Sequence, residues 1–104
     1  MSMLQEGLEE LKNKISLVAD WFYQQKFQAG YTELIGIIDD ITAVSMILEV
    51  NKEREDVSQL YQKLTESLQS IMIAMEQKDT VLIADIMSYE LLGLIDELID
   101  IKLG

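Results

Sequence analysis

Residues 79–103 constrain the fold of this chain more than any other stretch. Read as a helix, the stretch is apolar on most of its sides, with Val81, Leu82, Ile83, Ile86, Met87, Leu91, Leu92, Leu94, Ile95, Leu98, Ile99, Ile101 and Leu103. The polar residues form a narrow stripe at spacings of four, four, three and four: Asp85, Tyr89, Gly93, Asp96 and Asp100. This spacing predicts an α-helix over residues 80–103. A helix with so much apolar surface must be covered on several sides by other helices or by another subunit.

Three earlier segments have the same helical period and predict helices over residues 3–27, 32–50 and 54–77. The inward positions of the first are Leu4, Leu8, Leu11, Ile15, Val18 and Phe22. Those of the second are Leu34, Ile37, Ile38, Ile41, Val44 and Leu48. Those of the third are Val57, Leu60, Leu64, Leu68, Ile71 and Met75. Spacings that alternate between three and four indicate helices packed side by side at small crossing angles.

The connections between these segments are short and polar. Ser2 begins a capping box at the start of the first helix. Gly30 is suited to the left-handed conformation that ends a helix, and Thr32 would cap the next one. The run at 51–56 reads as a solvated turn, and Asp79 is the natural N-cap of the last helix.

These features predict an all-α fold, an antiparallel up-down-up-down four-helix bundle, in a single domain over residues 1–104. The chain has no proline, which suits long uninterrupted helices. An extended three-helix array, or a helical hairpin completed by dimerisation, are the competing arrangements. In the bundle, Leu11, Ile41, Leu68 and Ile95 are expected to be deeply buried.

Five aromatic residues fall near the first connection: Trp21, Phe22, Tyr23, Phe27 and Tyr31. They predict a hydrophobic plug that closes one end of the bundle. The alternative is a peptide-anchoring surface, because tryptophan and tyrosine are favoured at interfaces.

Composition excludes several classes of function. The formal charge of −11 disfavours binding to nucleic acid or to anionic membranes, since both would repel the chain. The chain has no cysteine and no histidine, so thiolate chemistry and the commonest general base and metal ligand are missing. The N-terminal segment does not resemble a signal peptide, and no apolar run is long enough to span a membrane. We therefore expect a cytoplasmic protein that is not an enzyme and carries no cofactor.

No catalytic arrangement is visible in the sequence, because the helical serines have no adjacent base to activate them. An oxygen-only site for magnesium or calcium is the alternative function, with four candidate ligands: Asp39, Asp40, Asp85 and Glu90. The simpler interpretation is that these acids keep an apolar bundle soluble. We therefore assign no metal ligand.

The last helix carries the candidate interaction residues: Asp85, Tyr89, Glu90, Leu92, Asp96 and Ile99. Leu92 and Ile99 border the polar stripe, where we expect apolar side chains to remain exposed. Ile35 and Ile47 add exposed apolar surface on the second helix. Such a surface suits either a twofold dimer or a basic amphipathic helix of a protein partner. Of the two, we predict a homodimer, since symmetric dimers are the commonest oligomers. A further hypothesis is an acidic mimic that occupies the nucleic-acid-binding site of another protein.

The pattern Lys78-Asp79-x-x-Leu82-x-Ala84-Asp85-Ile86-x-x-Tyr89-Glu90-Leu91 resembles the closing segment of small acidic helical proteins from bacteria that have no assigned activity. In those proteins a proline often follows the Tyr-Glu-Leu step, whereas this chain has Leu92-Gly93-Leu94. In fold, the chain also resembles flagellar export chaperones, which are acidic antiparallel bundles that bind an amphipathic segment of a partner. The resemblance transfers no functional residues. A likeness in fold alone does not transfer function either. The apolar circumference of the last helix and its acidic stripe lead us to expect a non-enzymatic interaction module, chaperone- or adaptor-like.

Overall fold

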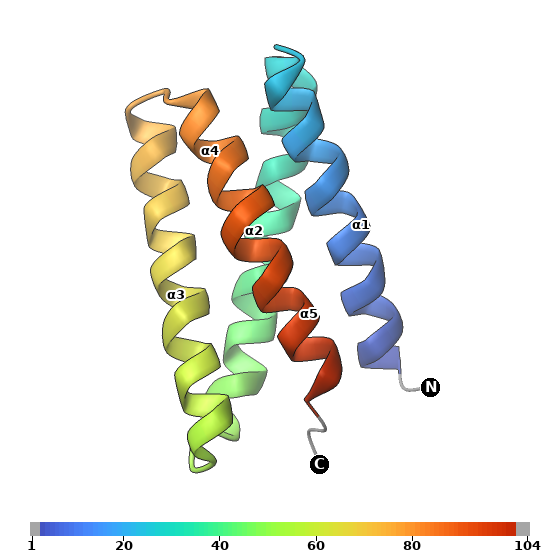
Figure 1. Cartoon of the computed structure of the whole chain (residues 1–104), viewed down its shortest axis with the longest axis vertical. Helices are drawn as coiled ribbons and strands as arrows, with labels where there is room; N and C mark the ends of the chain where they lie inside the picture. The colour runs from blue at the N-terminus through green and yellow to red at the C-terminus, as the bar shows by residue number, and fades with distance from the viewer. Residues whose placement is uncertain (1–2, 102–104) are drawn as a thin grey trace.

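The computed structural model describes residues 3–101, which form a four-helix bundle with up-down-up-down topology (Figure 1). The helices are α1 (Met3–Tyr23), α2 (Phe27–Val50), α3 (Glu55–Glu76) and a fourth helix in three parts, α4 (Thr80–Ile86), η1 (Met87–Leu91) and α5 (Leu92–Asp100). Helices α1 and α3 each pack against both α2 and the fourth helix, which lie at opposite corners (Figure 1). The all-α antiparallel bundle is thus confirmed. Among residues 3–101, no helix has the length and apolar character to cross a membrane.

The first connection differs from the prediction. Helix α1 ends at Tyr23 instead of residue 27, and α2 begins at Phe27 instead of Thr32. The left-handed residue is Gln25, with φ of 64°. The Lys26 amide donates to the carbonyl of Trp21, and the Gln25 amide donates to that of Phe22. This is a Schellman ending, in which a non-glycine residue takes the position expected for Gly30.

Gly30 instead lies within α2, and it is needed because of close packing. A Cβ atom at this position would lie 3.0 Å from the Phe22 ring. The Phe22 ring meets the Tyr31 ring edge-on, with 5.1 Å between the centroids. The aromatic plug is present in part: Phe22 is buried, Trp21 and Tyr31 are partly buried, and Tyr23 and Phe27 are exposed.

The other two connections agree with the sequence to within a residue. Residues 51–54 form the polar turn before α3. Residue Lys78 ends α3 in a left-handed conformation, with φ of 55°. The carboxylate of Asp79 accepts a hydrogen bond from the amide of Leu82 at 3.1 Å, which confirms Asp79 as the N-cap. The predicted cap at Ser2 lies outside the described residues.

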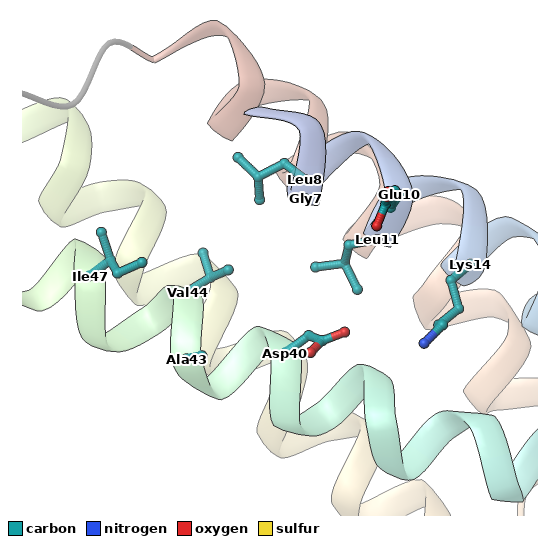
Figure 2. A pocket seen from close by; sticks show the side chains of 9 residues that line it. All are labelled: Gly7, Leu8, Glu10, Leu11, Lys14, Asp40, Ala43, Val44 and Ile47. Atoms are coloured by element: carbon teal, nitrogen blue, oxygen red, sulfur yellow. The ribbon is translucent and has the colours of Figure 1, made fainter. Parts of the chain in front are cut away.

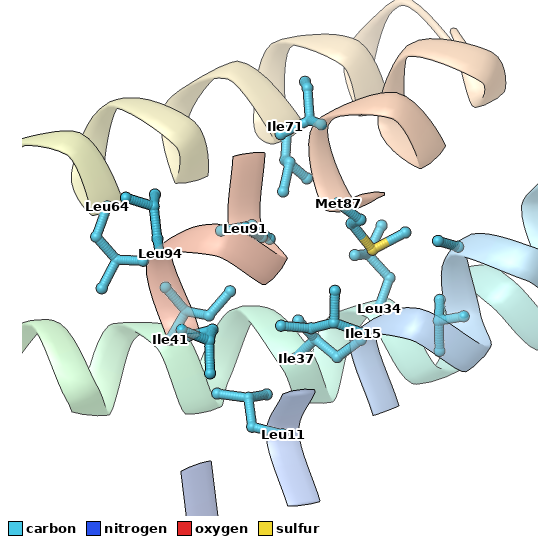
Figure 3. Packing of buried hydrophobic residues seen from close by; sticks show 14 of the residues in the cluster. Leu11, Ile15, Leu34, Ile37, Ile41, Leu64, Ile71, Met87, Leu91 and Leu94 are labelled. Atoms are coloured by element: carbon cyan, nitrogen blue, oxygen red, sulfur yellow. The ribbon is translucent and has the colours of Figure 1, made fainter. Parts of the chain in front are cut away.

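The core contains apolar side chains from all four helices, which meet along the bundle axis (Figure 3). Leu11, Ile41 and Ile95 are buried, as predicted. Leu68 is only partly buried, and so is Met75. Ser67 and Ala74 take their places in the core. The inward positions predicted for α3 include two consecutive steps of four residues, from Leu60 to Leu64 and from Leu64 to Leu68. Each such step rotates the side chain about 40° beyond a full turn, so the second step carries Leu68 away from the core.

The fourth helix contains a π-helical turn, η1, where the sequence predicted a continuous helix over 80–103. Ile83, Met87, Leu91 and Ile95 are all fully buried although each step between them is four residues. In a regular α-helix these steps would carry the side chains away from the core by about 40° each. The wider π turn takes up the extra residue and keeps both halves facing inward. The helix ends at Asp100, and Leu103 lies outside the described residues.

Candidate functional site

Asp85, the first candidate residue of the fourth helix, is bound by a side chain from α1. The Tyr23 hydroxyl donates to the Asp85 carboxylate at 2.5 Å. This hydrogen bond raises the pKa of Tyr23, since the donated proton is held by a negative acceptor. A hydrogen bond with Ser88 acts on that pKa in the opposite direction. The structure thus pairs Asp85 of the fourth helix with Tyr23 of α1.

Two further candidate acids also tie the fourth helix to its neighbours. The Ser67 hydroxyl of α3 donates to the Glu90 carboxylate at 3.0 Å. The Lys12 ammonium group of α1 lies 2.6 Å from the carboxylate of Asp96. The hydrogen bond and the charge of Asp96 raise the pKa of Lys12. These acids therefore hold the bundle together from both sides of the fourth helix.

The remaining candidates divide between surface and core. Tyr89 is 81% exposed, on the outside of η1. Leu92 and Ile99 are partly buried and pack against the hydrophobic core. The expectation that they form an exposed apolar edge was wrong, because both side chains pack against the core; the exposed apolar side chains of this helix are Val81 and Leu82, near its start. Tyr89 and Glu90 line one hollow between α3 and the fourth helix, whereas Leu92 and Ile99 pack inward.

The structure also separates the four acids considered as metal ligands. Asp39 and Asp40 belong to α2, whereas Asp85 and Glu90 belong to the fourth helix at the opposite corner. Within residues 3–101, no three acidic side chains come together in a way that could hold a metal ion. The oxygen-only site considered from the sequence therefore does not form from these residues.

Three exposed apolar side chains lie close together on the outer side of α2, near its C-terminal end, apart from Phe27 and Ile35 earlier in the helix. Met46 is 65% exposed, Ile47 is 40% exposed and Val50 is 85% exposed, and Ala43 is exposed beside them. Their positions follow the i, i+3, i+4, i+7 pattern of one helix face. We call these four residues the docking face. The same turns bury Ile41 on the inner side, so this half of α2 is apolar both inside and outside.

A groove between α1 and α2 adjoins the docking face (Figure 2). It has a volume of about 390 Å³. Leu8 and Leu11 enter it from α1, and Val44 and Ile47 enter it from α2 (Figure 2). A Cβ atom built on Gly7, at its edge, would meet no other atom within 4 Å. The groove is therefore open to a side chain from outside.

Carboxylates surround this apolar surface. Glu10 and Asp40 line the groove, and Asp39 is exposed on the outer side of α2. Lys14, also at the groove, lies 3.8 Å from the Glu33 carboxylate. From residue 27 to residue 50, α2 contains no lysine or arginine. The surface thus combines an apolar centre with a predominantly negative edge.

The sequence also contains a signal for this face. The prediction of exposed apolar surface at Ile47 extends to Met46 and Val50. Positions 43, 46, 47 and 50 form a second apolar set, on the side opposite the inward set. A helix with two opposed apolar sets in one segment indicates burial on both sides.

Over residues 1–101, the chain matches the family described as "Domain of unknown function (DUF8042)". No curated protein and no solved structure matches it. The match covers nearly all of the 104 residues. The chain, with its four-helix bundle and the apolar outer face of α2, therefore belongs to the DUF8042 family.

Proposed function

We propose that this protein is a non-enzymatic interaction module, adaptor- or chaperone-like, that binds an amphipathic or basic segment of a partner protein on the docking face. One observation carries the proposal: Met46, Ile47 and Val50 are exposed together on one side of a helix whose other side is already in the core. Exposed apolar side chains are normal when they are scattered. A contiguous set beside a groove is typical of an interaction surface.

The chemistry of the face suits binding rather than catalysis. The side chains of Ala43, Met46, Ile47 and Val50 contain no nucleophilic or titratable group. Methionine adapts its shape to different partners, and it is common on surfaces that bind variable apolar segments. The adjoining groove is lined by Leu8 and Leu11, both of which belong to the core, and by Val44 and Ile47.

The test is to disrupt the docking face in the native cell. Met46→Lys combined with Val50→Lys places two charges on it. Met72→Lys combined with Val81→Lys is the matched control, because those residues have the same two side-chain types and are 52% and 63% exposed on other helices. Tagged versions of the wild type and both variants are purified and the associated proteins are quantified by mass spectrometry. We expect a partner that is retained by the wild type and the control and lost from the docking-face variant.

Both variants should fold, since surface substitutions usually change stability by less than about 0.5 kcal/mol. Circular dichroism melting curves check this. If the same proteins co-purify in the same amounts with all three forms, the docking face is not a binding surface and the proposal fails.

A further inference from the structure

We infer that the partner segment is a single basic amphipathic α-helix, seated lengthwise between α1 and the outer side of α2. The inference rests on the proposed function and names the chemistry of its ligand. The docking face follows helix spacing over two turns, and the groove beside it runs between two helices. A helix that lays its apolar side chains into such a groove is a common mode of peptide recognition.

The distribution of charge selects a basic helix. Glu10 and Asp40 lie on the groove side of the docking face, and Asp39 is exposed on α2. Glu49, also exposed on α2, is paired with Lys52 at 3.9 Å. A partner helix whose apolar stripe covers the docking face would bring its flanking side chains to these acids. Lysine or arginine at those positions would meet opposite charges at the edge of the interface, where complementary charge favours association and selects among partners.

A second copy of this chain suits the same surface less well. Each copy has a net charge of −11, and the carboxylates around the docking face would approach those of the other copy. Like charges brought together across an interface oppose association. A basic helix buries the same apolar side chains without this repulsion.

Three designed peptides of roughly 18 residues, about five helical turns each, test whether binding needs both the basic charge and the helical apolar stripe. The first has leucine at i, i+3, i+4 and i+7 and lysine at the flanking positions. The second has glutamate in place of lysine. The third has the composition of the first in an order that removes the helical stripe. Each carries a fluorophore, and its binding to the full chain is measured by anisotropy.

We expect the basic amphipathic peptide to bind saturably and the acidic peptide not to bind. Affinity should weaken as salt is raised from about 50 to about 300 mM, because the contacts at the edge are screened. The docking-face variant Met46→Lys/Val50→Lys should bind at least about tenfold more weakly, while the control Met72→Lys/Val81→Lys should bind like the wild type. Equal binding of the reordered peptide, or equal loss in the control variant, would reduce the effect to general charge attraction and overturn the inference.

Sedimentation equilibrium of the wild type at several concentrations tests the competing occupant. A monomer is expected. A dimer that Met46→Lys/Val50→Lys dissociates would assign the docking face to a second copy and overturn the basic-helix inference. If cellular partners depend on the docking face but the basic peptide fails to bind, the proposed function stands and this inference falls.

Discussion

Helix α2 and the fourth helix have similar apolar patterns, since both carry apolar residues around most of their circumference, but the two helices are buried differently in the bundle. In the fourth helix, Leu92 and Ile99 at the border of the polar stripe pack against the core. In α2, Met46 and Val50 remain outside. The comparison shows that apolar girth alone does not identify the exposed face of a bundle helix.

Polar contacts distinguish the two helices as well. Tyr23, Ser67 and Lys12 reach the fourth helix from α1 and α3 at distances of 2.5, 3.0 and 2.6 Å. The ion pair between α2 and α1 is long, with 3.8 Å between Lys14 and Glu33. The fourth helix therefore makes closer polar contacts with its neighbours than α2 makes through Lys14 and Glu33, while apolar side chains of both helices fill the core.

The largest effect should come from truncating those inward side chains. Ile41→Ala in α2 and Ile95→Ala in α5 should each reduce the free energy of unfolding by about 2–5 kcal/mol, because both residues are fully buried and each change leaves a cavity. Met46→Ala, on the outside of α2, should change it by less than about 0.5 kcal/mol. Urea denaturation measures all three, and a cost for Met46→Ala equal to that of Ile41→Ala would place the docking face in the core.

Lysine substitutions compare the two apolar borders directly. Leu92→Lys or Ile99→Lys should destabilise the protein by about 1–3 kcal/mol. The lysine ammonium group would either turn away from the edge of the core or be buried without its hydrating water. Val50→Lys should stay within about 0.5 kcal/mol of the wild type, since its side chain is 85% exposed. Thermal melts followed by circular dichroism would show the difference, and equal melting temperatures would remove the contrast between the two helices.

Much of the fold was predictable because the heptad spacing directly encodes which side of each helix is buried. Ile15, Leu64 and Ile71 fit that spacing and lie in the core. The errors arose where spacing permits more than one answer. The sequence predicted Leu68 as a core residue because it lies at the end of two successive steps of four. Burial of Ser67 was not predicted, because it depends on how the fourth helix packs against α3.

Other features could not be read from local pattern. A glutamine at position 25 takes the left-handed conformation, so the more favourable Gly30 pointed to the wrong turn. The π turn follows from register requirements on both sides of the helix, which only the packed structure defines. The candidate site was placed on the helix with the most apolar circumference, although the contiguous exposed set of Met46, Ile47 and Val50 lies on α2. The spacing in α2 shows two opposed apolar sets, but which set faces the core depends on where the neighbouring helices lie.

The contacts that hold the fourth helix can be weakened singly. Ser67→Ala removes the hydrogen bond to Glu90 and leaves the glutamate in contact with solvent. We expect a loss of about 0.5–1.5 kcal/mol in the free energy of unfolding. Ser70→Ala, an exposed position on the same helix, is the control and should have a smaller effect. Urea denaturation distinguishes them, and an identical effect at both positions would mean that the Ser67–Glu90 contact contributes nothing.

Removing a hydroxyl group from α2 should not lower the stability of the protein, in contrast to Ser67→Ala in α3. The Tyr31 hydroxyl is buried and has no hydrogen-bond partner within residues 3–101. Tyr31→Phe removes this group and keeps the ring that packs on Phe22. We expect stability to stay unchanged or to rise by up to about 1 kcal/mol, since an unsatisfied buried polar group is costly. A clear loss of stability, measured by thermal melting, would contradict this assignment.

The smallest expected effect is a pH dependence specific to the fourth helix. Because the hydrogen bond to Asp85 raises the pKa of Tyr23 in the folded state, the protonated tyrosine stabilises the fold. This contribution is fully present below the pKa of an unfolded tyrosine, about 10, and is lost as the pH rises through the higher folded value. Stability of the wild type should therefore fall more steeply between about pH 9 and about pH 12 than that of Tyr23→Phe.

Lys12 also has a raised pKa, so its ion pair with Asp96 loses strength over a similar alkaline range in both proteins. The difference between the two profiles thus isolates Tyr23. Asp85→Asn removes the charge on which the shift depends, and its profile should match that of Tyr23→Phe. If the wild type and both variants lose stability in parallel, as measured by urea denaturation at each pH, the Tyr23–Asp85 hydrogen bond does not help to hold the fourth helix. The difference in polar contacts between the fourth helix and α2 would then depend on Ser67 and Lys12.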